Sequence, residues 1–175
     1  MKMMIKFYDT CSLLLKANTL FDEEEKFAIS SITLEELENI KTSNAKDPDI
    51  KYAARKLLHI LDEHHGTYDV HIFKESMLTP IKERDLSITN DTRILATAYD
   101  YKDIQTDSVA FVTNDLALKN IASLFFSDEC IISVNEEVDD EYCGYKEITF
   151  ENDAALEFFY TNYKRGLGQF LPRNE

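Results

Sequence analysis

The chain has 175 residues, of which 44% are hydrophobic, and this is enough for one globular domain with a buried core. It carries 33 Asp and Glu against 19 Lys and Arg, and the net charge of −14 argues against a protein that coats DNA or an anionic membrane through a basic surface. Three cysteines without metal-ligand spacing predict reduced thiols and a cytoplasmic protein, and no apolar run approaches the ~18 residues of a membrane span.

Strands and helices alternate along the chain. In order, the patterns of the first half predict a strand at 4–8, a short helix capped by Thr10, a strand at 27–32, a helix at 33–41 and an amphipathic helix from Ile50 to Leu61. The second half predicts a strand at 70–73, a helix from about 90 to 99, a strand at 109–113, a helix at 115–126 and a strand at 130–134. After an acidic connection, an edge strand at 145–150 and a final helix at 153–163 are expected.

This alternation predicts an α/β fold of three layers, α/β/α, with a mainly parallel central sheet and a short helical extension at the C-terminus. We expect residues 1–150 to form one domain. Residues 151–175 then form a C-terminal helix and tail, which either packs on the same domain or leads to a further domain.

Four acidic residues lie just after predicted strands or at predicted helix starts: Asp9, Glu36, Asp91 and Asp115. In an open parallel sheet, sites form beyond the carboxyl ends of the strands, so the fold can gather these side chains at one edge. A structural role is the alternative, because an acid in the first helical turn offsets the helix macrodipole. Glu36 also has the spacing of a capping box with Thr33.

Helical geometry favours a functional role for these acids. Asp91 shares a face with Ile94 and Leu95, and Asp115 shares a face with Leu118, so both carboxylates are predicted on stripes that meet the sheet. A buried carboxylate is costly unless a metal or hydrogen bonds receive it. On the helix after Thr33, the same reasoning points Glu36 toward the cleft and its neighbour Glu35 toward solvent.

Several carboxylates in one place repel each other unless a divalent cation neutralises them. Oxygen ligands without Cys or His suit Mg²⁺ or Mn²⁺ rather than Zn²⁺. Such an ion polarises a phosphoryl group and activates a water molecule for attack. The acids therefore support the hypothesis of metal-assisted phosphodiester hydrolysis.

Four segments that carry these acids, in the same order, resemble the PIN-domain nuclease family. They are FYDTCSLLL with Asp9 and Thr10, SSITLEELENIK with Glu36, NDTRILATAY with Asp91, and FVTNDLALK with Thr113, Asn114 and Asp115. The phrases EELENIK, NDTRIL and EYCGYKEI are most similar to the PIN domain at the N-terminus of PhoH-like proteins, in which a P-loop ATPase domain follows. The resemblance covers about residues 3–150.

The resemblance implies an endonuclease that acts mostly on single-stranded RNA and depends on Mg²⁺ or Mn²⁺. It implies that Asp9, Asp91 and Asp115 coordinate the metal and that Glu36 assists through the metal or a water molecule. Thr10, Thr113 and Asn114 are implied as supporting residues, with Thr113 orienting a carboxylate or a water molecule. It also implies a homodimer and a PhoH-like ATPase domain, in cis or in trans, as partners. Cys11 departs from the pattern, because many members have Asn or Ser there.

The distribution of charge decides whether an acidic chain can bind RNA. Two acidic runs, 22–25 and 136–141, hold nine of the negative charges, and without them and the four site acids the chain is almost neutral. Arg93 and Lys119 lie two and four residues after site acids, so both are candidates for contacts with phosphate.

Three other functions compete with this hypothesis. A phosphatase of the haloacid-dehalogenase type would need a second Asp at position 11, where this chain has Cys. A catalytically weak PIN domain could act as an RNA- or protein-binding module, although all four candidate acids are present. A toxin of a toxin–antitoxin pair would use the same chemistry and would add a protein partner.

Overall fold

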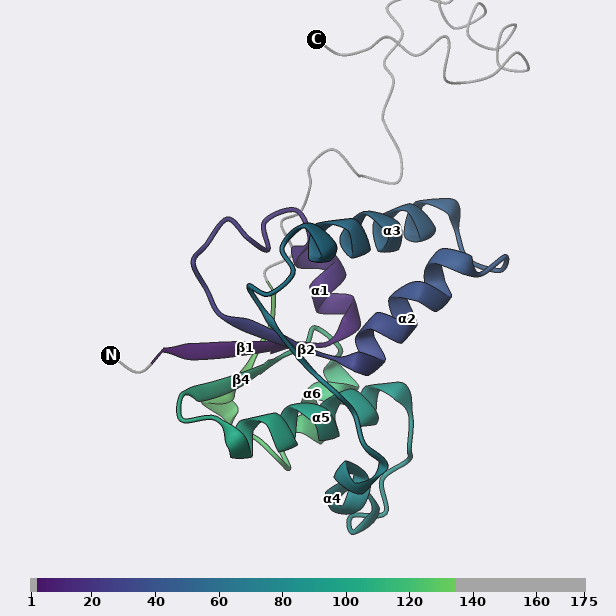
Figure 1. Cartoon of the computed structure of the whole chain (residues 1–175). Coiled ribbons are helices and arrows are strands. Elements are labelled where there is room, and N and C mark those ends of the chain that lie inside the picture. Colours follow the sequence, from purple (N-terminus) through teal and green to yellow (C-terminus); the bar gives the residue numbers. More distant parts are fainter. Residues whose placement is uncertain (1–2, 135–175) are drawn as a thin grey trace, which may run out of the picture. The chain divides into compact units, whose positions relative to one another are not determined.

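The computed structural model describes residues 3–134, whose elements belong to one unit, Met1–Glu136. Its centre is a sheet of five parallel strands in the order β3-β2-β1-β4-β5 (Figure 1). The strands are β1 (Met4–Tyr8), β2 (Phe27–Ser30), β3 (Asp69–His71), β4 (Ser108–Val112) and β5 (Ile131–Ile132). The expected parallel sheet is confirmed, and the strand expected at 145–150 and the helix expected at 153–163 lie outside the described residues.

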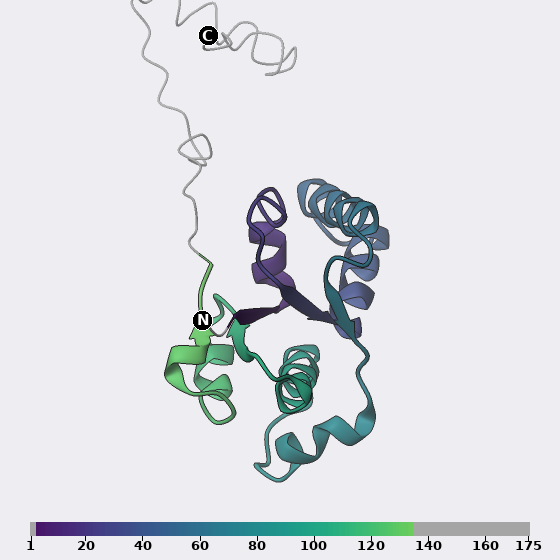
Figure 2. The same cartoon turned by 60° about the vertical axis from the view of Figure 1, so that its left-hand side comes forward.

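Helices cover both faces of this sheet, as the two views in Figures 1 and 2 show. One layer contains α1 (Thr10–Lys16), α2 (Ser31–Thr42) and α3 (Pro48–Glu63). The other contains η1 (Glu75–Leu78), α4 (Thr79–Lys82), α5 (Asn90–Ile104) and α6 (Leu116–Ala122), and the short turn η2 (Asp128–Cys130) precedes β5. This arrangement confirms the three-layer α/β/α fold. Within residues 3–134, none of the helices has both the length and the apolarity needed to cross a membrane.

The layer of α1, α2 and α3 packs on the sheet mainly through leucines. Leu13 of α1, Leu37 of α2 and Leu57 of α3 are fully buried in one cluster, and Tyr8 and Phe27 join it from the strands. The buried apolar stripe of α3 is shorter than its sequence predicts, because Ile50, near the beginning of the helix, is 46% exposed. Ala54, Leu57 and Leu61 of α3 are buried in this cluster, and α3 also packs along α2.

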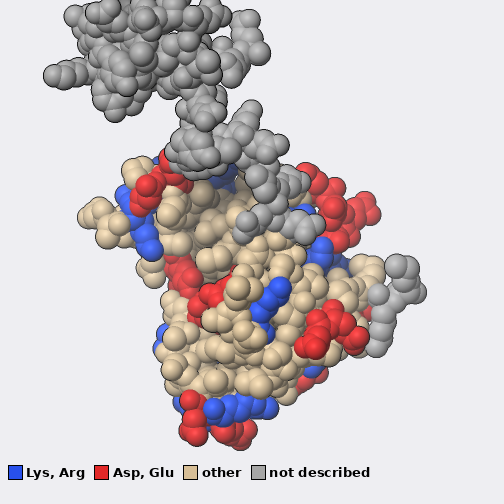
Figure 3. Space-filling view, turned by 180° about the vertical axis from the view of Figure 1, so that it is seen from behind, with Lys and Arg blue, Asp and Glu red and all other residues tan. Residues whose placement is uncertain are grey.

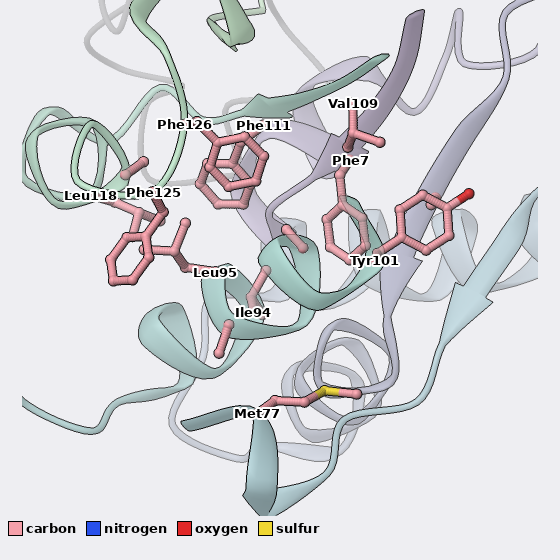
Figure 4. Close-up of a cluster of buried hydrophobic side chains, with 14 of the residues drawn as sticks. Phe7, Met77, Ile94, Leu95, Tyr101, Val109, Phe111, Leu118, Phe125 and Phe126 are labelled. Carbon is pink, nitrogen blue, oxygen red and sulfur yellow. The ribbon is translucent and has the colours of Figure 1, made fainter. Parts of the chain in front are cut away.

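The layer of α5 and α6 packs on the opposite face through many aromatic side chains. Phe7 and Phe111 extend from the central strands, and Phe125 and Phe126 close the cluster after α6 (Figure 4). Helix α5 was expected to end near Tyr99 but continues to Ile104. The reason is tertiary, because Tyr101 in the extra turn is buried against Phe7, with ring centroids 5.6 Å apart.

Three other elements have boundaries that differ from the sequence prediction. Helix α6 ends at Ala122 rather than at 126, since Phe125 and Phe126 leave the helix to fill the aromatic cluster. Only Ile131 and Ile132 of the expected strand at 130–134 pair with β4, and Cys130 belongs to the turn before it. The expected strand at 70–73 also moves slightly, to Asp69–His71.

Candidate functional site

The order of the strands places a topological switch between β1 and β4. Strands β1, β2 and β3 follow one another in one direction, whereas β4 and β5 lie on the other side of β1. At the carboxyl edge, the amide of Asp9 donates to the carbonyl of Val112 at 3.0 Å, so the ends of β1 and β4 are tied together. Open α/β sheets bind ligands at such a switch point. The residues that follow β1 and β4 are therefore the first candidates for a site.

Asp9 follows β1 and begins helix α1. Its residue is only 3% exposed, and Oδ1 accepts the amide of Ser12 at 2.7 Å, so Asp9 is the N-cap. The prediction that Thr10 caps this helix is wrong, because the extended backbone of Asp9 already supplies the capping carboxylate one residue earlier. Thr10 is instead the first helical residue and is buried, and its Oγ1 lies 3.4 Å from that of Thr33.

Helix α2 begins earlier than the sequence suggests. Ser30, the last residue of β2, is its N-cap, and the Ser30 Oγ accepts the amide of Ile32 at 3.2 Å. The expected capping box between Thr33 and Glu36 is therefore wrong. Thr33 lies within the first turn of α2 and is fully buried, and Glu36 lies in the second turn. Without a capping role, the Glu36 carboxylate is available for other contacts.

Glu36 is half-buried and faces the other acids, whereas Glu35 is exposed as expected. Partial burial is the main cause that raises the pKa of Glu36 above its ordinary value of 4.5. Hydrogen bonds from Thr10 and Asn90 oppose this rise, and the charges of Asp91 and Asp9 add to it. These contacts bring α1, α2 and the beginning of α5 together around one carboxyl group.

Asp91 lies in the first turn of α5, which Thr89 caps by accepting the amide of Thr92 at 3.2 Å. The prediction that a buried stripe carries Asp91 is wrong, because Asp91 is exposed although Ile94 and Leu95 are fully buried. The face of α5 that carries Ile94 and Leu95 is therefore exposed at the N-terminal end of the helix, where Asp91 lies. Partial burial, followed by the charges of Asp115 and Asp9, raises the pKa of Asp91.

Asp115 begins α6 just after β4. Its Oδ1 accepts the amide of Leu118 at 3.0 Å, so Asp115 is the N-cap of the helix, and like Asp91 it is exposed rather than buried. The buried Thr113 fixes this turn, since its Oγ1 accepts the amide of Asp115 at 3.1 Å. Asn114 points elsewhere: its amide group exchanges two hydrogen bonds with the backbone of Val134. Asn114 thus joins this turn to the end of β5.

The thiol of Cys11 is surrounded by the four candidate acids. Burial, followed by the charges of Asp9, Asp91, Glu36 and Asp115, raises the pKa of Cys11. The fold therefore places all four carboxylates within electrostatic range of one thiol. Sequence comparison with the nuclease pattern identifies Cys11 only as a departure, and its position among the acids depends on the fold.

The four carboxylates are gathered but not closely packed. The donor set is oxygen only, which matches the chemistry of Mg²⁺ and Mn²⁺. Within residues 3–134, however, no three His, Cys, Asp or Glu side chains lie close enough together to hold an ion as they stand. Charge repulsion is consistent with this open arrangement, because the acids raise one another's pKa.

A hollow of about 460 Å³ adjoins the carboxylates between α2 and the beginning of α5. Glu36 and Asp91 form one side, and the remaining lining residues are Asn39, Ile40, Ser43, Lys46 and Asn90. Sequence reasoning missed this hollow. The spacing of Asn39 and Ser43, three and seven residues after Glu36, was the available signal, because it places all three on one helical face.

The candidate cations have different surroundings. Arg93 is half-buried and its Nη1 donates to Asn90 at 3.1 Å, at the edge of the hollow. Lys119 is half-buried one turn into α6, where its amide donates to the carbonyl of Asp115 at 2.9 Å. On the face shown in Figure 3, acidic and basic side chains are interspersed and no broad basic surface is seen among the described residues.

Two solved structures are similar to this chain. The crystal structure of PAE2754 from Pyrobaculum aerophilum is similar, with a TM-score of 0.50 and 20% identity over 74% of this chain and 83% of that one. The crystal structure of VapBC2 from Rickettsia felis, bound to a DNA fragment from their promoter, gives a TM-score of 0.43 and 19% identity over 73% and 96% of the two chains. A search of curated protein sequences finds no match.

The first of these likenesses supports the fold alone, because the identity is low. The sequence itself identifies the family. The family model of the PIN domain matches residues 7–125, which include all four candidate acids, the end of β1 and the whole of β4. The chain therefore belongs to the PIN domain family, a family of nuclease-type domains.

Proposed function

We propose that this protein is an endoribonuclease that hydrolyses phosphodiester bonds of single-stranded RNA with the help of Mg²⁺ or Mn²⁺. The observation that carries the proposal is the convergence of four carboxylates near the ends of β1 and β4. Three come from the starts of α1, α5 and α6 and one from the second turn of α2, and Cys11 lies within electrostatic range of all of them. Membership of the PIN domain family supports the nuclease class of this activity.

In this proposal, Asp9, Asp91 and Asp115 hold the metal, and Glu36 assists from α2. When bound, the ion polarises the phosphoryl group and activates a water molecule for attack. The residues of this chain have separate tasks. Asp9 is fixed by the amide of Ser12 and Asp115 by the amide of Leu118, so these two are held in place by the backbone.

Glu36 and Asp91 are not helix caps, and partial burial raises the pKa of each above its ordinary value. Glu36 lies in the second turn of α2 and is half-buried beside Thr10 and Asn90, on the side of the other acids. We assign it the positioning of the attacking water molecule. Thr113 has a supporting role, since it fixes the turn of Asp115.

The surface properties favour a single strand as substrate. A duplex presents one phosphate charge per ~1.7 Å and is bound through many basic contacts. The interspersed charges in Figure 3 offer few such contacts, whereas a short stretch of single strand needs only a few. Arg93, at the edge of the hollow, is a candidate for one of them; Lys119 is a weaker one.

The remaining parts of the proposal concern context. We propose residues 1–150 as the nuclease domain and residues 151–175 as a C-terminal helix and tail. The resemblance of EELENIK and NDTRIL to PhoH-like proteins is the basis for proposing a PhoH-like ATPase domain, in cis or in trans, as a partner, and the resemblance to the PIN family is the basis for proposing a homodimer. Cys11 and Cys130 are free thiols, which supports a reducing compartment such as the cytoplasm.

A cleavage experiment tests the activity. Labelled single-stranded RNA, and DNA of the same sequence, are incubated with the protein and Mg²⁺, Mn²⁺ or a chelator. We expect cleavage of RNA with either ion, none with chelator, and a loss of at least about 100-fold in Asp9→Asn and Glu36→Gln. The matched control is Glu35→Gln on the same helix, which should cleave like the unaltered protein because Glu35 is exposed.

Cleavage that survives both Asp9→Asn and chelator would contradict the assigned site and the metal. A specific observation favours one second candidate, a PIN domain that binds RNA or protein without cutting: the described acids are not arranged to hold an ion as they stand. Binding of the labelled RNA without cleavage under any of the metal conditions would support this binding module instead.

A further inference from the structure

The hollow beside the carboxylates has two chemically different sides. Glu36 and Asp91 supply negative charge on the side of the site. Asn39, Ser43 and Lys46 supply hydrogen-bond donors and a positive charge on the far side. A nucleic-acid strand is anionic along its length. One phosphate could approach Glu36 and Asp91 through a bound cation, and the next phosphate would then meet the donors and the positive charge of Asn39, Ser43 and Lys46.

The backbone around Lys46 is fixed at both ends. Before it, the Oγ of Ser43 accepts the amide of Ala45 at 3.2 Å and closes a tight turn after α2. After it, Asp47 caps α3 by accepting the amide of Asp49 at 2.8 Å, and Pro48 starts that helix. Lys46 is therefore the one position between two anchored turns. Its side chain can move while its Cα stays beside the hollow.

The charge of Lys46 is not used inside the described part of the protein. No described carboxylate lies within ion-pair distance of Lys46, and no described group accepts a hydrogen bond from it. Lys41, on the last turn of α2, is different, because its Nζ is paired with Glu38 at 2.8 Å. An exposed lysine that lines a hollow and has no protein partner is suited to a phosphate.

We propose that this hollow holds the RNA strand next to the bond that is cut, with Lys46 contacting the neighbouring phosphate and Asn39 and Asn90 contacting the attached nucleotide. The inference rests on the proposed ribonuclease function, since it names how that substrate is held. Ile40 supplies an apolar surface between the two asparagines for the face of the sugar or base. Lys46 then adds affinity for the strand at the phosphate beside the bond that is cut.

The test separates binding from cleavage. Binding of a fluorescein-labelled single-stranded RNA is measured by anisotropy with Mg²⁺, in the full chain carrying Asp9→Asn so that the RNA stays intact. Adding Lys46→Ala should weaken binding about fivefold at low salt. It should also reduce the slope of log affinity against log salt by about 0.7, the value for one lost phosphate contact on a single strand. Lys46→Arg should restore both.

Lys41→Ala is the matched control, because it removes the same charge from the same helix end without touching the hollow. It should leave affinity and slope within experimental error of the Asp9→Asn background. In the otherwise unaltered protein, Lys46→Ala should raise KM for cleavage and leave kcat within about twofold.

Equal affinities for Lys46→Ala and Lys41→Ala would overturn the inference, whether both are unchanged or both are weakened. This outcome is distinct from failure of the proposed function. If RNA binding depends on Lys46 but the unaltered protein never cleaves, the hollow is a binding site and the ribonuclease proposal fails. If the protein cleaves RNA and Lys46→Ala changes neither KM nor the salt slope, the ribonuclease proposal stands and the hollow has another role.

Discussion

The two helical layers of this protein each bring two acids to the site, but they are built differently. The layer of α1, α2 and α3 packs on the sheet through leucines, and α3 reaches the site only by supporting α2. The layer of α5 and α6 packs through aromatic rings, and α5 itself both fills the core and carries Asp91. The site thus lies where two separately packed cores meet across one sheet.

Despite this difference, each layer supplies one fixed and one freer acid. Asp9 and Asp115 are helix caps whose oxygens accept backbone amides. Glu36 and Asp91 cap nothing, and their pKa values are raised. The comparison shows that packing places the helices, whereas capping decides which carboxylates keep a set orientation. Substitutions in either layer can test each part of this statement.

The largest expected effect comes from truncating a buried leucine in each layer. Leu57 of α3 and Leu95 of α5 are both fully buried. Leu57→Ala and Leu95→Ala should each lower the free energy of unfolding by about 2–5 kcal/mol, because each leaves a cavity in a packed core. Denaturant unfolding of both variants, followed by circular dichroism, measures the two losses.

Ile50→Ala on α3 is the control and should change the free energy of unfolding by about 0.5 kcal/mol or less, since Ile50 is 46% exposed. Both layers share the central strands, so each variant should still unfold in one cooperative transition. A separate transition for one layer would break the comparison, because the two cores would then be independent.

The next effect separates the caps from the other acids. At Asp9 and at Asp115, Ala should be less stable than Asn by about 0.5–2 kcal/mol, because Asn still accepts the amide at the helix start and Ala does not. The charge is lost in both substitutions, so relief of repulsion cancels. At Asp91, which caps nothing, Ala and Asn should be nearly equal. Thermal unfolding with chelator compares the Ala and Asn variants at each of the three positions. An Ala variant that is less stable than the Asn variant by as much at Asp91 as at Asp9 and Asp115 would refute the distinction between capping and non-capping acids.

The smallest effect is the pH dependence of Asp91. Its pKa in the folded protein lies above the ordinary value of 3.8, so the native state binds this proton more tightly than the unfolded state does. Stability therefore falls as the pH rises from 3.8 through the raised pKa, and the loss is complete above it. Asp91→Asn should thus be more stable than the unaltered protein at pH 7, by less than about 1 kcal/mol because the side chain is exposed.

The same difference should vanish when the pH falls below 3.8, since Asp91 is then neutral in both states. Melting temperatures of the two metal-free proteins across this range provide the measurement. A difference that is constant with pH would mean that Asn acts through packing and not through charge. A lower stability of Asp91→Asn at pH 7 would contradict the repulsion among the acids.

Much of the fold could be predicted from local patterns. The strand at 4–8 and the position of Asp9 after it follow from a short β-rich run that ends at Asp9, and both are confirmed, although Asp9 rather than Thr10 caps the next helix. The errors lie where two local signals compete. Ser30 and Thr33 are both good caps, and the end of β2 decided in favour of the earlier one. The length of α5 depended on Tyr101 packing against Phe7, which no local pattern contains.

The sequence by itself determined the alternation of strands and helices and the set of acids that follow strands or begin helices, because periodicity and capping are properties of neighbouring residues. Only the tertiary structure decided which of these acids meet. Asp9 and Asp115 are brought together because β1 pairs with β4, although more than a hundred residues separate them in the chain. The hollow with Lys46 has the same origin, since its walls come from α2, the loop that follows it and the start of α5.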